Sequence, residues 1–337
     1  PPRSTLFPYT TLFRSFLTFG PLLAQKFEVS LTSGHTSFIR WLEYSNDDKF
    51  FITAAEDNMA KLWDASTGRE IRVFNGHMDW VTFAYAHTAK GILVTGSMDG
   101  YALVWVINTG EILKRFDPPQ SAEYGLNNII ESGDLSKDGR YLAVGHRGGQ
   151  VFVYDLEMGE KYSKIPIAEY RINVIRFAPD GNSLLVACGG SIVKSNVGSL
   201  ERFDFRTGER IKKYRIAPGE FHALTFDQTM RFIALNTSSM PLIEIFKAEG
   251  GISRKFNWEG NHHTPCEQLY FAPDGNELYA MSKAMDYINV YSTSTGKILR
   301  KIELPGEQME NCALSGNGKF LAVADRKNYI YILDPQT

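Results

Sequence analysis

From residue 26 onward, short runs of β-branched and aromatic residues alternate with polar turns. One unit consists of a run of about four to six such residues, a polar turn, a second run, a tight turn and a third run, which is often followed by a turn ending in Thr-Gly. Short runs bounded by Asp, Asn and Gly are typical of antiparallel strands and not of helices. The pattern therefore predicts an all-β protein.

The unit recurs with a regular spacing. A glycine ends the turn after the third run, and successive glycines lie 42, 49, 49, 43 and 45 residues apart, at Gly68, Gly110, Gly159, Gly208, Gly251 and Gly296. Five residues before each glycine stands a large ring, at Trp63, Trp105, Tyr154, Phe203, Phe246 and Tyr291. A period near 40–45 residues is typical of a four-stranded propeller blade. A final unit ending at Leu333-Asp334 brings the predicted number of repeats to seven.

The first two repeats share a polar set with identical spacings of 18, 4 and 6 residues. The sets are His35, Thr53, Asp57 and Trp63 in the first repeat, and His77, Thr95, Asp99 and Trp105 in the second. A buried imidazole can bridge the carboxylate and the hydroxyl, and the hydroxyl can bind the indole N–H, so every polar group is satisfied. A His–Asp–Thr set also occurs in hydrolases, but its repetition favours a structural role.

These sets resemble the WD-repeat family, in a bacterial type with degenerate later repeats, over residues 26–334. The resemblance implies a single seven-bladed β-propeller of four-stranded antiparallel blades. The run at 26–31 lies where the outermost strand of a preceding blade would be, so we expect it to complete the last blade and close the ring. The chain ends at 335–337, where other repeats next place Gly, which is consistent with truncation.

The N-terminal residues are kept out of the fold prediction. Residues 1–15 match the translation of a sequencing adapter and are interpreted as an artefact. Residues 16–25 are apolar and end in Ala-Gln, which suits either a lead-in to the first strand or the remnant of a signal peptide. The second interpretation favours export to the periplasm over the alternative, a cytoplasmic location.

Composition limits the classes of partner. The chain has 36 Lys and Arg against 38 Asp and Glu, a formal charge of −2, so we expect no nucleic-acid partner and no polybasic membrane anchor. We also expect no membrane insertion, a monomeric propeller and no cofactor. Three cysteines without metal-ligand spacing are interpreted as apolar strand residues, and Asn261-His262-His263 as a polar loop and not a metal site.

The resemblance also implies a binding surface. WD-repeat propellers most often bind partners on their narrower face, where three positions of each repeat point outward. Two of them flank the start of the innermost strand, and the third stands just before the aspartate of the tight turn. Carried over, the expected contacts are Phe38, Arg40, Glu56, Trp80, Met98, Arg147, Arg171, Glu220, His222, Glu267 and Glu310, with Ala324 as the third position of the last repeat.

Two sectors of that face differ in character. An apolar sector over the first three repeats is expected to consist of Phe38, Trp80, Ile129 and Met98, with Arg40, Arg147 and Arg171 at its edge. Over the last three repeats, an acidic arc for a basic segment of a partner is expected at Glu220, Glu267 and Glu310. The alternative is that the rings pack beneath their own loops and the glutamates are only solvated.

Three functions are compatible with this sequence. The first is a non-catalytic platform for protein or peptide partners. The second is the sensory or regulatory part of a larger enzyme, such as a caspase-like peptidase, and the third is a propeller enzyme with a metal or cofactor in its channel. The sequence lacks hydrolase, zincin and kinase motifs, which favours the platform.

Overall fold

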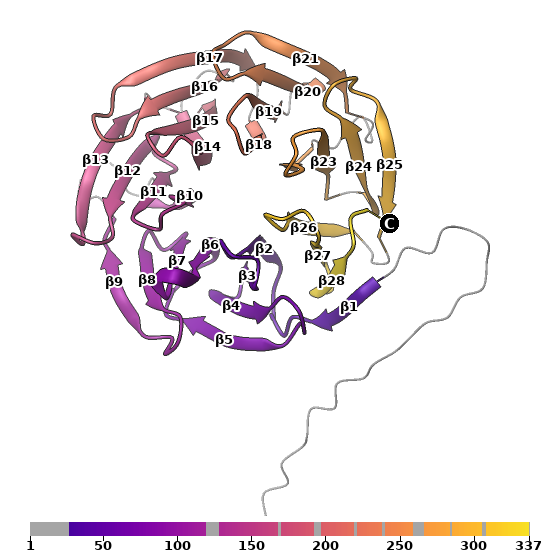
Figure 1. Ribbon diagram of the computed structural model, residues 1–337. Coiled ribbons are helices and arrows are strands. Elements are labelled where there is room, and N and C mark those ends of the chain that lie inside the picture. The colour runs from indigo at the N-terminus through magenta and orange to yellow at the C-terminus, as the bar shows by residue number, and fades with distance from the viewer. Residues whose placement is uncertain are drawn as a thin grey trace, which may run out of the picture.

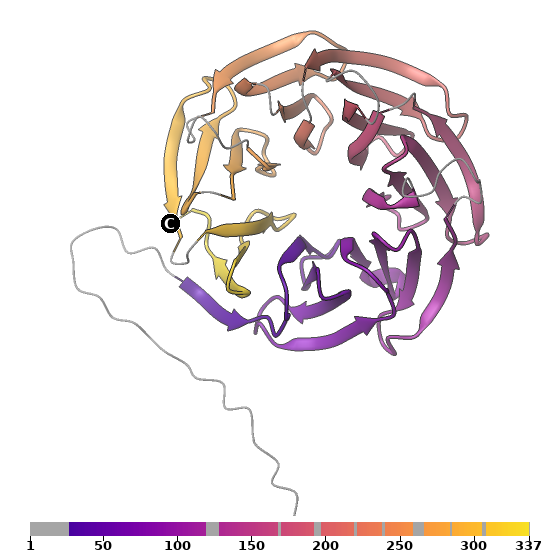
Figure 2. The same ribbon diagram turned by 180° about the vertical axis from the view of Figure 1, so that it is seen from behind.

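Seven four-stranded antiparallel sheets surround a central axis as the blades of a propeller (Figures 1 and 2). The computed structural model describes residues 27–118, 128–167, 170–191, 197–218, 221–237, 240–258, 266–283, 285–304 and 308–336. Within these ranges the helical structure is one short turn, η1 (Thr88–Lys90). The predicted all-β, seven-bladed fold is confirmed.

Each blade contributes one strand to each of four concentric positions. The innermost strands are β2 (Ile39–Tyr44), β6 (Val81–His87), β10 (Ile130–Leu135), β14 (Tyr170–Phe177), β18 (Phe221–Phe226), β22 (Gln268–Phe271) and β26 (Met309–Leu314). The second strands are β3 (Phe50–Ala55), β7 (Ile92–Ser97), β11 (Tyr141–His146), β15 (Ser183–Ser191), β19 (Phe232–Thr237), β23 (Glu277–Met281) and β27 (Leu321–Asp325). The third strands are β4 (Met59–Asp64), β8 (Ala102–Val106), β12 (Gln150–Asp155), β16 (Val197–Asp204), β20 (Met240–Lys247), β24 (Tyr287–Ser292) and β28 (Tyr329–Leu333). The outer strands are β5 (Glu70–Asn75), β9 (Ile112–Phe116), β13 (Glu160–Pro166), β17 (Arg210–Pro218), β21 (Ile252–Asn257), β25 (Ile298–Glu303) and β1 (Phe27–Thr32).

The seventh blade combines the two ends of the described chain. Its strand order is β1-β28-β27-β26, and the antiparallel register pairs Ser30 with Tyr331 and Leu31 with Ile330. Figure 1 shows β1 beside β28, at the point where the indigo and yellow ends of the chain meet. Blade seven thus has four strands although the last repeat supplies three.

Local sequence explains the recurring turn between the third and outer strands. The glycine of this turn has a positive φ in six blades, for example 68° at Gly68 and 77° at Gly110, a conformation that glycine adopts without a steric penalty. Gly68 N–H donates to Asp64 O and Gly110 N–H to Val106 O, each at 2.8 Å. The rings five residues earlier, such as Trp105 and Tyr291, are buried on the third strands.

The hydrophobic core lies between neighbouring blades. One cluster joins Ile52 and Leu62 of blade 1 to Leu93 and Trp105 of blade 2. Another joins residues of blade 1 to Ile330 and its neighbours in blade 7. Because each blade buries its faces only against the next, stability depends on the whole ring.

Polar contacts, which we call inter-blade clasps, also join consecutive blades at the circumference. In each, a side chain of an outer strand donates to carbonyls of the turn after the third strand of the next blade. Arg72 binds Asn108 O at 2.7 Å and Thr109 O at 3.0 Å, and Lys114 binds Leu156 O and Glu157 O. Arg300 donates in the same way to Pro335 O at 2.9 Å.

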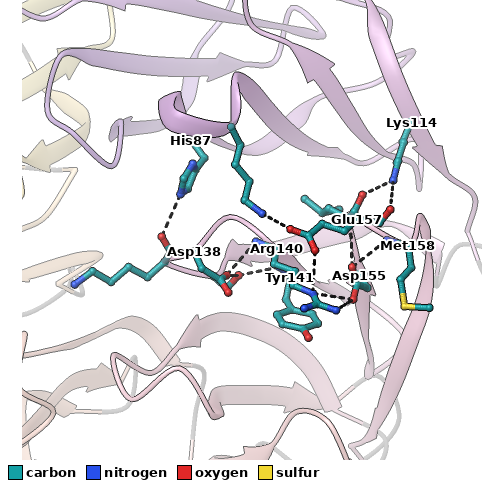
Figure 3. Close-up of polar contacts among 12 residues, drawn as sticks. His87, Lys114, Asp138, Arg140, Tyr141, Asp155, Glu157 and Met158 are labelled. Carbon is teal, nitrogen blue, oxygen red and sulfur yellow. Dashed lines mark hydrogen bonds and ion pairs between the residues drawn. The ribbon is translucent and has the colours of Figure 1, made fainter.

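Figure 3 shows the junction of blades 2 and 3. Lys114 lies beside Glu157, and the guanidinium of Arg140 holds the buried carboxylate of Asp155 at 2.8 Å and 3.0 Å. His87 reaches the carbonyl of Lys137 at 3.2 Å. Carbonyls that strands leave unpaired are thereby satisfied by the neighbouring blade.

Candidate functional site

A buried polar network fixes the loops of blade 1. His35 Nδ1 lies 2.8 Å from Asp57 Oδ2, and its Nε2 lies 2.8 Å from Thr53 Oγ1, which also accepts the Trp63 indole N–H at 3.0 Å. Since a carboxylate only accepts, Nδ1 carries the proton and Nε2 accepts from the threonine hydroxyl. The structure therefore brings together all four residues that the spacing connects.

The second network repeats this geometry in blade 2. His77 Nδ1 lies 2.9 Å from Asp99 Oδ2, its Nε2 lies 2.8 Å from Thr95 Oγ1, and Trp105 Nε1 donates to the same hydroxyl at 2.9 Å. Each aspartate also accepts a backbone N–H from the residue after the histidine, from Thr36 at 3.0 Å and from Met78 at 2.9 Å. The loop before the innermost strand is thus tied to the turn after the second strand.

These tied loops carry the predicted contact positions of the first two blades. Glu56 N–H donates to Phe38 O at 3.0 Å, and Met98 N–H donates to Trp80 O at 2.9 Å. They lie on the face where the innermost strands begin, which we call the narrow face. The two networks therefore hold the first and third contact positions side by side.

Large apolar side chains are exposed on the narrow face over blades 1 and 2. Phe38 is 44% exposed and Met78 is 87% exposed, while Trp80 and Met98 are half-buried. Arg40 forms an ion pair with Glu56 and lies over the Trp80 ring, 4.8 Å from its centroid. In the structure the apolar sector therefore consists of Phe38, Met78, Trp80 and Met98, while Ile129 is half-buried.

The charged residues at the other described contact positions of the narrow face are paired within the molecule. Arg147 and Arg171 both hold Glu131, which is almost fully buried. Glu310 is also buried and pairs with Arg326 at 2.7 Å, while Lys283 lies 3.4 Å from Glu267 and 3.6 Å from Glu310. A basic segment of a partner would have to compete with these cations.

The remaining predicted positions differ in their placement. His222 is half-buried and lines the central channel. Glu220 lies outside the described residues, so the acidic arc has two described members. Ala324 is wrongly placed by the sequence reasoning: it is buried in β27, and Arg326 occupies the outward position, with its N–H donating to Gln308 O at 3.1 Å.

The error at Ala324 has a local cause. Asp325 resembles the aspartate of the tight turn, but it ends β27 and its carboxylate caps the turn by accepting from Lys327 N–H at 2.9 Å. The left-handed residue of this turn is Asn328, with φ of 62°, as Asn58 is in blade 1 with φ of 68°. Arg326 precedes Asn328 by two residues, as Glu56 precedes Asn58, so the left-handed residue identifies the outward position in both blades.

Comparison with known proteins matches this architecture. The family model of the WD domain, G-beta repeat, matches residues 26–64 and 68–106, the two repeats that carry the complete networks. This match covers the first two of seven four-stranded blades. The chain is a seven-bladed propeller that contains WD repeats.

Curated relatives of this WD-repeat propeller match parts of it. Serine-threonine kinase receptor-associated protein of Gallus gallus is 29% identical over 46% of this chain, which spans 41% of that protein. Subunit I of eukaryotic translation initiation factor 3 from Aspergillus niger is 24% identical over 47% of this chain, which spans 61% of it. Autophagy-related protein 16 of Arabidopsis thaliana is 22% identical over 85% of this chain and 45% of its own length.

The chain therefore spans less than two thirds of the length of these relatives. Their names are those of an associated protein, a subunit and an autophagy-related protein, and none is the name of an enzyme. They support a general role in protein interaction. All three organisms are eukaryotes, so the expected bacterial type has no support from them.

The central channel of the propeller contains a hollow that opens to solvent. Arg176 extends into it from blade 4, donates to Tyr85 OH of blade 2 at 3.0 Å, and lies over the Trp41 ring of blade 1 at 5.3 Å. One arginine thus bridges three blades across the channel.

Two carboxyl groups surround Arg176. Burial raises the pKa of Glu43 to about 7 and that of Asp134 to about 6, although the positive charge of Arg176 opposes both shifts. Asp134 also accepts the Phe177 N–H at 2.6 Å. Two carboxyl groups share one guanidinium, so their ionisation is only partly compensated.

Among the described residues, no group of three or more His, Cys, Asp or Glu is arranged to hold a metal, and all three cysteines are free and buried. Asn261-His262-His263 lies outside the described residues. In the described part of the chain, no helix is long and apolar enough to span a membrane.

Sequence reasoning missed Met78, Lys283 and Arg326. Met78 follows a network histidine, and its backbone N–H is bound to Asp99. Lys283 and Arg326 pair with glutamates that lie at least 16 residues earlier or later in the sequence, so their local sequence does not indicate these contacts. A signal for Met78 was present, because a residue whose backbone is held by the network at the loop surface has its side chain directed outward.

Proposed function

We propose that this propeller is a non-catalytic platform that binds a protein partner through the apolar sector of its narrow face. The observation that supports this is the exposure of Met78 and Phe38, 87% and 44%, beside Trp80. Exposed aromatic and methionine side chains beside an arginine are the composition that interface hot spots favour.

Rigidity of the surrounding loops supports the same proposal. The histidine networks tie the loops of blades 1 and 2 to their turns, so few conformations are lost when a partner binds. A preordered surface keeps more of its contact energy as affinity. The names of the relatives, a receptor-associated protein and a subunit of a multi-subunit factor, agree with a role in binding proteins.

The test compares two substitutions in the apolar sector, Phe38→Ala and Trp80→Ala. Each is expected to weaken partner binding by about 1–3 kcal/mol, the range for an aromatic anchor, and to leave the fold intact. Affinity capture with quantitative mass spectrometry identifies the proteins retained by the wild type, and the dissociation constant of the purified partner is then measured for each variant.

A matched control is Leu113→Ala on outer strand β9, because Leu113 is also an exposed apolar residue, 53% accessible, but lies away from the narrow face. This control should bind the partner as the wild type does. If both sector variants retain the same proteins with the same affinity, the apolar sector is not the binding surface.

A further inference from the structure

Blade 4 differs from the other blades in length and in charge. Its strands β15 and β17 have nine residues each and are the longest among the described strands. Its described residues, 170–191 and 197–218, contain eight Lys or Arg and four Asp or Glu, a formal charge of +4. The whole chain has a formal charge of −2, so this blade concentrates positive charge that the total conceals.

The charge is greatest at the outer edge of the blade. β17 is the last strand of its sheet and lies on the circumference of the ring (Figure 1). It contains four Lys or Arg and no acidic residue, whereas no other outer strand has more than two cations. Ile211, near its start, is 54% exposed.

The cations of this edge outnumber the carboxylates that face them. Arg210 and Lys213 share Glu201, at 3.1 Å and 3.0 Å, although their side chains are 55% and 37% exposed. Lys212 binds a backbone carbonyl, that of Glu249. Two cations thus divide one carboxylate, which leaves positive charge at the surface.

The turn before β17 extends this surface. Arg206 lies over the Phe205 ring, 4.6 Å from its centroid, and donates to Asn182 Oδ1 at 3.0 Å. The carboxylate of Asp204 is occupied by the turn amides of Arg206 and Thr207. Glu209 is the remaining acidic residue of the turn and is exposed.

We propose that Arg206, Arg210, Ile211 and Lys213, which we call the blade 4 edge, bind an acidic, extended polypeptide segment. Charge complementarity selects the partner, because carboxylates spaced along an extended chain match cations spaced along a strand. Like charges oppose pairing between two copies of this edge. A lipid surface would require a larger apolar face than Ile211 provides.

The test uses fluorescein-labelled decaglutamate as the probe and fluorescence anisotropy as the measurement. The variant R206Q/R210Q removes two exposed charges and leaves Lys213 to pair with Glu201. We expect it to keep the wild-type melting temperature and to bind decaglutamate about five- to tenfold more weakly. The matched control K297Q/K301Q removes two lysines at and next to β25 and should bind as the wild type does.

Two further probes distinguish an acidic polypeptide from other ligands of the blade 4 edge. Labelled decalysine, the first probe, should not bind. Vesicles of phosphatidylcholine with phosphatidylserine should bind weakly, with no difference between wild type and R206Q/R210Q. The proposal is overturned if both double variants bind decaglutamate equally, or if R206Q/R210Q loses vesicle binding but not decaglutamate binding. Trp80→Ala should leave decaglutamate binding unchanged, so this result is independent of the narrow face.

Discussion

The effect of a buried polar residue of this propeller on stability depends mainly on its hydrogen-bond partners, as it does at Asp57. Burial opposes its ionisation, but hydrogen bonds from His35 and from the amides of Thr36 and Met59 outweigh that effect and lower its pKa. The carboxylate therefore contributes stability in its charged form, which is present above its unfolded pKa and lost as the pH falls through the folded pKa.

Replacing Asp57 with alanine tests this contribution. The change leaves the His35 Nδ1–H and the Thr36 N–H without their acceptor, so the free energy of unfolding at pH 7 should fall by about 1–3 kcal/mol. Urea unfolding measures it, with Asp117→Ala, an exposed aspartate, as the control. Equal unfolding midpoints for the two variants would show that the network adds nothing to stability.

Glu43 is expected to have the opposite pH dependence. Its pKa of about 7 in the folded protein exceeds the value of about 4.3 for an unfolded chain. The folded state then binds more protons between these values, so stability falls as the pH rises across that window. Asp134, with a pKa of about 6, acts in the same direction over a narrower range.

Glu43→Gln should therefore be more stable than the wild type at pH 8, by about 3 kcal/mol, the free energy that corresponds to raising the pKa from about 4.3 to about 7. Its stability should also change less between pH 5 and pH 8. Urea midpoints at both pH values test this, with the exposed Glu111→Gln as the control. A variant with the wild-type pH dependence would mean that Glu43 is ionised throughout.

At the scale of elements, the strands and turns follow from local sequence to different degrees. The recurring ring and glycine identified the third strand and the following turn in six blades, because both requirements lie within six residues. Tight turns depend on single residues of less distinctive type, which is why Asp325 was mistaken for the turn aspartate of blade 7. The inter-blade clasps were not predicted, since an exposed Arg or Lys on a strand has no local signature of a partner.

Arg72→Ala tests whether the clasps stabilise the ring. The change removes hydrogen bonds to Asn108 O and Thr109 O, and the free energy of unfolding should fall by about 1–2 kcal/mol. Thermal unfolding is the measurement. Arg69→Ala, an exposed arginine three residues earlier, should have little effect, and a similar loss in both variants would argue against the clasp.

At the scale of the whole molecule, we expect closure of the ring to depend on β1, which pairs with β28. A chain that begins at Ser33 lacks this strand and leaves the edge of β28 unpaired. We expect it to unfold at a lower temperature and to self-associate, because an open sheet edge pairs with other chains. A chain that begins at Lys26 retains β1 and is the matched control. Light scattering and thermal unfolding compare them, and equal behaviour would show that β1 does not close the ring.

The sequence by itself determined the repeat, its number and the two polar networks, because each depends on spacing along one chain. It also indicated the apolar sector through the position of Phe38 and Trp80, although the exposure of Met78 came from the structure. These features are local or repeat with a fixed period.

Only the tertiary structure decided which charges remain at the surface. Lys283 and Arg326 compensate Glu267 and Glu310, and Arg176 crosses the channel to reach two other blades. The formal charge of −2 gave no indication of a basic surface, yet the described residues of blade 4 have a formal charge of +4. The physical reason is that electrostatic interaction depends on distance in space, and the closed ring brings together residues that lie far apart in the sequence.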